Sequence, residues 1–96
     1  MKTAAFKTSD YLKTQKHVVS YLNAALEDGD HAVLLEALRN VAQAKGGVGA
    51  LAKAADVSRE SLYRTLSRRG NPKIETIMQL LRALGLRLAI ERRTAA

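Results

Sequence analysis

Five polar residues between positions 59 and 67 have the side-chain chemistry and the spacing of a helix that reads double-stranded DNA. They are Arg59, Glu60, Tyr63, Arg64 and Ser67. Because helix positions three and four apart share a face, these residues would form one solvent-facing stripe. Arginine can fork onto guanine O6 and N7, glutamate can accept a hydrogen bond from cytosine N4, and serine and tyrosine hydroxyls can reach phosphates or base edges.

The order of these residues along the helix separates their expected roles. A recognition helix contacts bases mostly through its N-terminal residues, so Arg59, Glu60 and Arg64 are the candidates for sequence reading. Basic residues further along are better suited to phosphates, and these are Arg68, Arg69 and Lys73. The full set of expected DNA-binding residues is Ser58, Arg59, Glu60, Ser61, Tyr63, Arg64, Ser67, Arg68, Arg69 and Lys73.

The distribution of charge favours a polyanionic partner. The chain has a net charge of +7, and residues 1–47 carry six basic against five acidic side chains, whereas residues 48–96 carry ten against four. Positive charge concentrated on a small domain suggests nucleic acid first and an anionic membrane second. A basic protein without a polyanionic partner is the plain alternative.

Other kinds of chemistry find little support. The absence of cysteine excludes disulfides and cysteine-based zinc sites, and no apolar run approaches the length of a membrane span. His17 and His31 lack partners at metal-binding spacing, and Ser58 and Ser61 lack a nearby base. We therefore expect no metal, no cofactor and no enzymatic activity. Without an apolar signal-peptide core, the default location is cytoplasmic.

Apolar residues recur at helical spacing in five segments, which predicts an all-α chain. The expected helices are residues 14–26, 30–45 and 48–54, a fourth from Ser58 to before Arg68, and residues 71–84. Expected N-caps are Thr14, Asp30, Ser58 and Asn71, the last with Pro72 at the first helical position. The last helix should bury Ile74, Ile77, Met78, Leu81 and Leu84, and the first should bury Val18, Leu22, Ala25 and Leu26. Arg39 and Asn40 should face water.

The third and fourth helices form the pair that would place the polar stripe. Ala52 and Ala55 are small enough for a close helix crossing, and Asp56 occupies a turn position that often requires a left-handed backbone. Val57 can pack on Leu62, a hydrophobic staple that sets the direction in which the fourth helix starts. Leu62 and Leu66 would bury the inner side of that helix.

Residues 86–92 change from helical to alternating periodicity. Leu86, Leu88 and Ile90 alternate with Arg87 and Ala89, which predicts a short β-strand. One strand cannot satisfy its own backbone, so its partner would be the same segment of a second copy or a strand of another protein. The expected organisation is an arm and helix at 1–29, a DNA-binding domain at 30–85 with its core at 48–67, and a strand and tail at 86–96.

The helix pair resembles the helix-turn-helix of Xre/Cro-type repressors. The resemblance lies in LAKAADVS at residues 51–58 and SLY at 61–63, and it extends over residues 30–84. The resemblance narrows to the addiction-module antidote proteins, the HigA-like antitoxins, because of two further segments, NPKIETI at 71–77 and LRALGLRL at 81–88. A preceding segment of the SDYLKT…YLNAALEDGD kind, residues 9–30, is similar to the same family.

This resemblance implies a homodimeric autorepressor that binds palindromic, double-stranded operator DNA and neutralises a co-encoded toxin, usually a RelE-like ribonuclease. The sequence departs from the family pattern at Gly49 and Ala50, where Ser or Thr and then Gln are usual, and at Asp56, where glycine is usual. These departures motivate one alternative, a toxin-binding module with weakened DNA binding. Another alternative is a phage-type regulator without a toxin.

Overall fold

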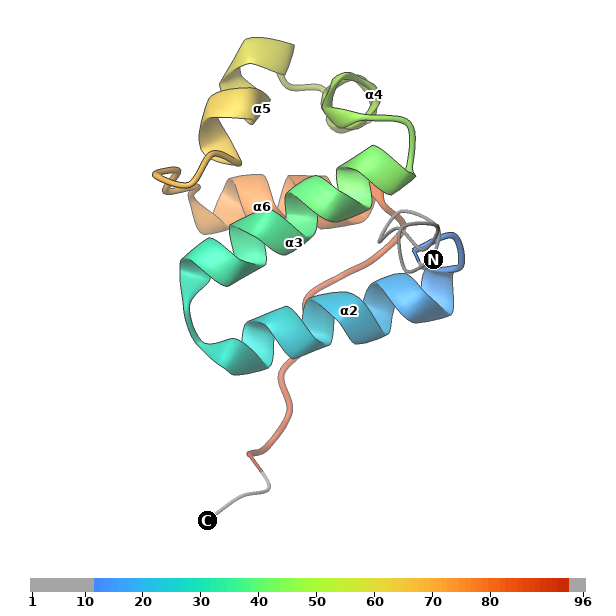
Figure 1. The fold of residues 1–96 in the computed structure, drawn as a ribbon, viewed down its shortest axis with the longest axis vertical. Helices are drawn as coiled ribbons and strands as arrows, with labels where there is room; N and C mark the ends of the chain where they lie inside the picture. Colours follow the sequence, from blue (N-terminus) through green and yellow to red (C-terminus); the bar gives the residue numbers. More distant parts are fainter. Residues whose placement is uncertain (1–11, 94–96) are drawn as a thin grey trace, which may run out of the picture.

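Helices account for all the regular secondary structure in residues 12–93, which are the residues that the computed structural model describes (Figure 1). They are α2 (Gln15–Asp28), α3 (His31–Ala44), α4 (Val48–Ala55), α5 (Arg59–Thr65) and α6 (Ile74–Ala83). The prediction of an all-α chain with five helices is confirmed for this part of the sequence. Among these residues no helix is long and apolar enough to cross a membrane.

Local side chains determine where three of the helices begin. Thr14, Asp30 and Ser58 each accept a hydrogen bond from a backbone N–H in the first turn that follows, at 3.0–3.2 Å. Each bond satisfies a donor that the helix itself cannot pair, and replacing such a cap by alanine typically costs about 1 kcal/mol. All three predicted caps are therefore confirmed.

The fourth predicted cap, at Asn71, is wrong. The N-cap of α6 is Lys73, which is extended at φ −70° and ψ 155° and makes no side-chain capping bond. Gly70 is buried so close to the end of α5 that a Cβ there would overlap the Thr65 carbonyl. The chain then needs residues 71–73 to reach the start of α6, and Pro72 lies in this connection instead of in the helix.

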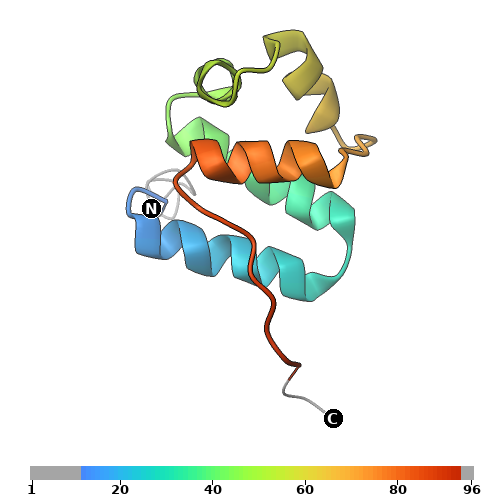
Figure 2. The same cartoon turned by 180° about the vertical axis from the view of Figure 1, so that it is seen from behind.

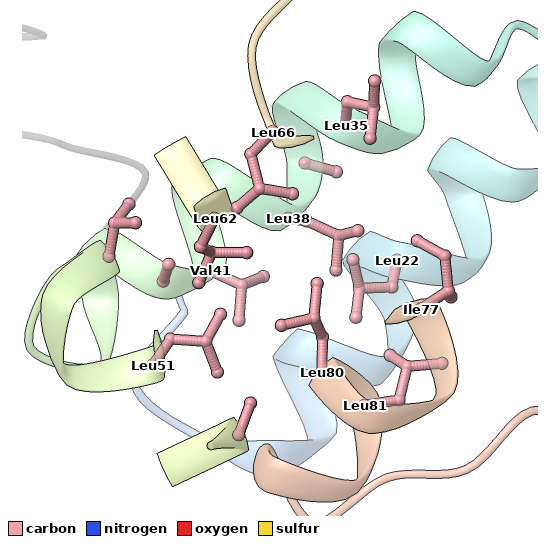
Figure 3. Packing of buried hydrophobic residues seen from close by; sticks show 14 of the residues in the cluster. Leu22, Leu35, Leu38, Val41, Leu51, Leu62, Leu66, Ile77, Leu80 and Leu81 are labelled. Atoms are coloured by element: carbon pink, nitrogen blue, oxygen red, sulfur yellow. The ribbon is translucent and has the colours of Figure 1, made fainter. Parts of the chain in front are cut away.

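A single aliphatic cluster joins the helices. α2 packs on α3, α3 on α4, and α4 on both α5 and α6. Figure 3 shows Leu22 of α2, Leu38 of α3 and Leu80 of α6 pointing toward one another. Apart from Gly70, the buried residues of this range are Leu12, Val18, Leu22, Ala25, Leu35, Ala37, Leu38, Val41, Ala42, Val48, Leu51, Ala52, Ala55, Leu62, Leu66, Ile77, Leu80 and Leu81, all of them apolar.

Two predicted inner faces are rotated in the structure. On α6, Ile74 and Met78 are 65% and 45% exposed, whereas Leu80 is fully buried. On α2, Leu26 is 48% exposed although it continues the buried stripe. Periodicity indicates that an apolar face exists, but the docking angle between helices decides which part of that face is covered. Apolar side chains on α2 and α6 consequently remain open to solvent.

The predicted strand at residues 86–92 is not present in the single chain. Residues 86–93 have no regular secondary structure, and Figure 2 shows them leaving α6 and running past α2. Leu86 is half-buried against the core, whereas Ile90 is fully exposed. A strand forms only where a neighbouring strand supplies hydrogen-bond partners, and residues 12–93 contain no such strand. The Leu86 N–H instead donates to the Leu81 carbonyl at the end of α6, at 2.7 Å.

Replacement of Leu38 by alanine is expected to lower the free energy of unfolding by about 2–5 kcal/mol, because it opens a cavity at a fully buried position. The matched control is Leu26→Ala, which makes the same change at an exposed position and is expected to cost less than about 1 kcal/mol. Urea unfolding of both variants measures the difference. Equal losses would contradict the assignment of the core.

Candidate nucleic-acid interface

Small side chains allow α4 and α5 to lie against each other and against the core. Ala52 and Ala55 are buried on the inner side of α4, as predicted. Leu62 is the buried residue within α5, and Val57, just before the helix, is half-buried against the same core. The inner residues of the helix pair thus have the arrangement that the sequence predicts.

The turn between α4 and α5 depends on a left-handed residue. Asp56 has φ 61° and ψ 44°, and it is the one non-glycine residue of the described chain with a positive φ. Its N–H donates to the Lys53 carbonyl at 3.2 Å, and the Val57 N–H donates to the Ala52 carbonyl at 3.0 Å. These two bonds satisfy carbonyls at the end of α4 and reverse the chain. The predicted left-handed turn at Asp56 is confirmed.

The outer face of α5 presents the candidate base-reading residues. Arg59, Glu60, Tyr63 and Arg64 are all exposed. Glu60 and Arg64 lie on the side of α5 opposite Leu62, whereas Arg59 lies only about 60° from Leu62 around the helix. Glu60 lies in the first turn, where a carboxylate interacts favourably with the positive end of the helix. Ser61 is half-buried, and the Ser58 hydroxyl oxygen accepts the capping bond from the Ser61 N–H. The structure therefore brings four of the predicted residues onto one exposed surface.

The remaining candidates do not lie on the helix. α5 ends at Thr65, so Ser67, Arg68 and Arg69 lie in the following turn, and Lys73 lies at the start of α6. The prediction that Ser67 continues the helical stripe is wrong. Its hydroxyl and its backbone N–H both donate to the Arg64 carbonyl, at 2.7 and 3.2 Å, in the turn that follows the helix.

Two residues expected to face water instead connect helices. The Arg39 guanidinium, on α3, donates through Nη1 to the Leu66 carbonyl at the C-terminus of α5. The adjacent Asn40 donates through Nδ2 to the Tyr21 hydroxyl of α2 at 2.7 Å. Both side chains are half-buried. Arg39 places a cation at the negative end of α5 and thereby helps to orient this helix.

Arg59 lies across the space between α4 and α5. Its guanidinium carbon is 5.7 Å from the centre of the Tyr63 ring. The Arg59 Nε lies 3.4 Å from the position that a Cβ on Gly49 would occupy. The base-reading candidate nearest the helix start is thus in contact with both helices.

The charge of this region suits a polyanion. Residues 56–73 carry five basic against two acidic side chains, and all seven are exposed. Figure 1 shows α4 and α5 at one end of the molecule and α2 at the other. Within residues 12–93 no group of three or more histidine and carboxylate side chains could hold a metal ion. The exposed arginine, lysine, serine and tyrosine side chains of this surface can bind a partner through charge and hydrogen bonds.

Comparisons with known proteins identify relatives over nearly the whole chain. A family model described as "Probable addiction module antidote protein" matches residues 2–92. A Haemophilus influenzae protein described as "Uncharacterized protein" is 33% identical over 86 residues, which is 90% of this chain and 88% of the relative. No solved structure matches the chain.

Replacement of Asp56 by glycine is expected to raise the free energy of unfolding by up to about 1 kcal/mol, because glycine adopts the left-handed conformation without a steric penalty. Asp56→Ala removes the same carboxylate but retains a Cβ, and should lower stability by about 1 kcal/mol. Thermal or urea unfolding distinguishes the two variants. If both are equally stable, the backbone conformation at this turn is not what limits stability.

Proposed function

The chain belongs to the family of probable addiction module antidote proteins, and from that membership we propose that it is a dimeric antitoxin that represses its own operon. The family gives the chain an antitoxin role in a toxin–antitoxin module and thereby implies a toxin partner. The observation that carries the repressor half of the proposal is the exposed face of α5, with its capped N-terminus and its arginines.

DNA binding would follow the geometry of an Xre/Cro-type helix-turn-helix. The N-terminus of α5 would enter the major groove, with Glu60 and Arg64 among the residues facing base edges. Arg68, Arg69 and Lys73 lie beyond the helix end, where phosphate contacts would orient the protein on the duplex. The solvent exposure of these five side chains and the positive charge of four of them support the proposed DNA contacts.

A homodimer would match the symmetry of a palindromic operator. The unpaired segment 86–92 has the alternating pattern of a strand, and Ile90 is fully exposed in the single chain. Pairing with the same segment of a second copy would satisfy its backbone and cover its apolar residues. The two recognition helices of the dimer would then bind half-sites about 34 Å apart, or a multiple of that distance.

The toxin would bind at the opposite end of the molecule. α2 exposes the apolar side chains of Val19 and Leu26. The end of α2 and the turn that follows it carry three exposed carboxylates, Glu27, Asp28 and Asp30. A surface of this composition complements a small basic protein such as a RelE-like ribonuclease. Because α4 and α5 lie at the other end, the toxin and the operator could be held together.

A second candidate function is a toxin-binding module that has lost DNA binding. Gly49 and Ala50 supply no polar side chain to the first turn of α4, and Asp56 adds a negative charge beside the candidate interface. This candidate predicts a stable toxin complex with no operator binding. Copurification with the adjacent gene product, together with an absent gel shift, would favour it.

Arg64→Ala is expected to weaken operator binding by about 1–3 kcal/mol and to relax specificity at one base pair. Arg68→Ala is expected to weaken binding to all sequences similarly and to reduce the salt slope by about one. Fluorescence anisotropy at several salt concentrations, with the DNA upstream of the gene, measures both effects.

Lys16→Ala is the matched control for this series, since it removes an exposed positive charge from α2, at the far end of the molecule. It should leave affinity almost unchanged. If the wild-type protein shows no preference for the upstream sequence at moderate salt, the repressor half of the proposal fails.

Substitution of Val19 and Leu26 by serine should weaken capture of the co-expressed toxin at least about tenfold, because it removes exposed apolar contact area. Deletion of α2 would be uninformative, because Val18, Leu22 and Ala25 belong to the core. The control is Ile74→Ser with Met78→Ser, which makes a similar change on α6. Unchanged toxin capture by the α2 variant would place the toxin on another surface.

A further inference from the structure

The side chain of Arg59 is held by residues from two helices. It begins in the first turn of α5 and reaches the first turn of α4. Its Nε, Cδ and Cζ atoms lie 3.4, 3.6 and 3.7 Å from the position that a Cβ on Gly49 would take. The guanidinium carbon is also 5.7 Å from the centre of the Tyr63 ring. An exposed arginine without such contacts would sample many rotamers.

Gly49 is not required by the backbone. It lies inside α4 and lacks the positive φ of Gly29, Gly46, Gly47 and Gly85. Within a helix, glycine costs about 1 kcal/mol relative to alanine. What glycine provides here is space, since a methyl group would just touch Arg59, and any longer side chain would compete with the guanidinium for the same volume.

Tyr63 provides the second contact to Arg59. It lies four residues after Arg59 on α5, a spacing at which helical side chains meet. An arginine over a tyrosine ring gains about 0.5–1 kcal/mol at an exposed site, mainly through the electrostatics of the ring face. Gly49 leaves the arginine room to lie along α4, and Tyr63 keeps it there.

We propose that Gly49 and Tyr63 are positioning residues that direct Arg59 to a DNA phosphate beside α4, and not to a base edge. The inference rests on the proposed DNA binding and names the contact that Arg59 makes. The first helix of a helix-turn-helix crosses the DNA backbone, so a guanidinium lying on its first turn is beside phosphates. Gly49 and Ala50 have no polar side chain there, and Arg59 supplies the missing donor from α5.

Arg59→Ala distinguishes the two contacts. A phosphate contact predicts about tenfold weaker binding to the operator and to each of its single-base-pair variants, with the base preference unchanged and the salt slope lowered by about one. Arg64→Ala, measured beside it, should instead alter preference at one base pair. If Arg59→Ala relaxes preference at a base pair, Arg59 reads that base and the inference is wrong.

Gly49→Leu tests the positioning itself. Leucine would occupy the volume of the guanidinium and should weaken binding about tenfold, whereas Gly49→Ala should change binding less than about twofold. Ala54→Leu is the control, since it adds the same side chain to an exposed position about 140° further around α4. In an Arg59→Ala background, Gly49→Leu should have no further effect, and an undiminished effect there would overturn the inference.

Tyr63 gives a readout that needs no DNA. Stacking on the ring should move the Arg59 side-chain protons upfield in the NMR spectrum of the wild-type protein and of Tyr63→Phe, but not of Tyr63→Leu or Gly49→Leu. Operator binding by the wild type without this upfield shift would overturn the positioning while leaving the proposed function intact. An upfield shift in a protein that binds no operator would instead refute the proposed function and, with it, the phosphate contact.

Discussion

Burial of one aliphatic cluster is the interaction on which the rest of the structure depends. Each of the five helices described contributes to it, and the buried side chains are all apolar. α4 contacts α3, α5 and α6, and it can do so because Ala52 and Ala55 keep its inner surface small. α5 is a seven-residue helix that buries only Leu62 within its length. Its orientation therefore depends on the cluster, on the turn at Asp56 and on the bond from Arg39.

Features governed by neighbouring residues were predictable from the sequence. The caps at Thr14, Asp30 and Ser58 and the left-handed turn at Asp56 each depend on atoms a few residues away. These hydrogen bonds can be predicted from the sequence because donor and acceptor lie two or three residues apart along the chain. The cap expected at Asn71 failed for the complementary reason. The start of α6 depends on how closely Gly70 packs against the end of α5, and tertiary packing determines that distance.

Features governed by distant residues were not predictable. The hydrogen bond from Arg39 to the Leu66 carbonyl joins residues 27 positions apart, and no local sequence pattern predicts it. The contact of Arg59 with Gly49 likewise depends on the angle between two helices. At the candidate site, periodicity placed Arg59, Glu60 and Arg64 on one exposed face, but it could not indicate that Arg59 leans toward α4. The exposed Ile74 and Met78 reflect the same dependence on docking angle.

The consecutive residues Arg39 and Asn40 have a geometric consequence for any assembly this protein forms. Through them, a single turn of α3 is tied to α5 on one side and to α2 on the other. α3 thus lies between α2 and α5 and sets the distance between the two outer surfaces that these helices form. Within the described chain no flexible linker separates the two surfaces. Two molecules bound at opposite ends of this protein, one at α2 and one at α5, would therefore be held in a fixed orientation relative to each other.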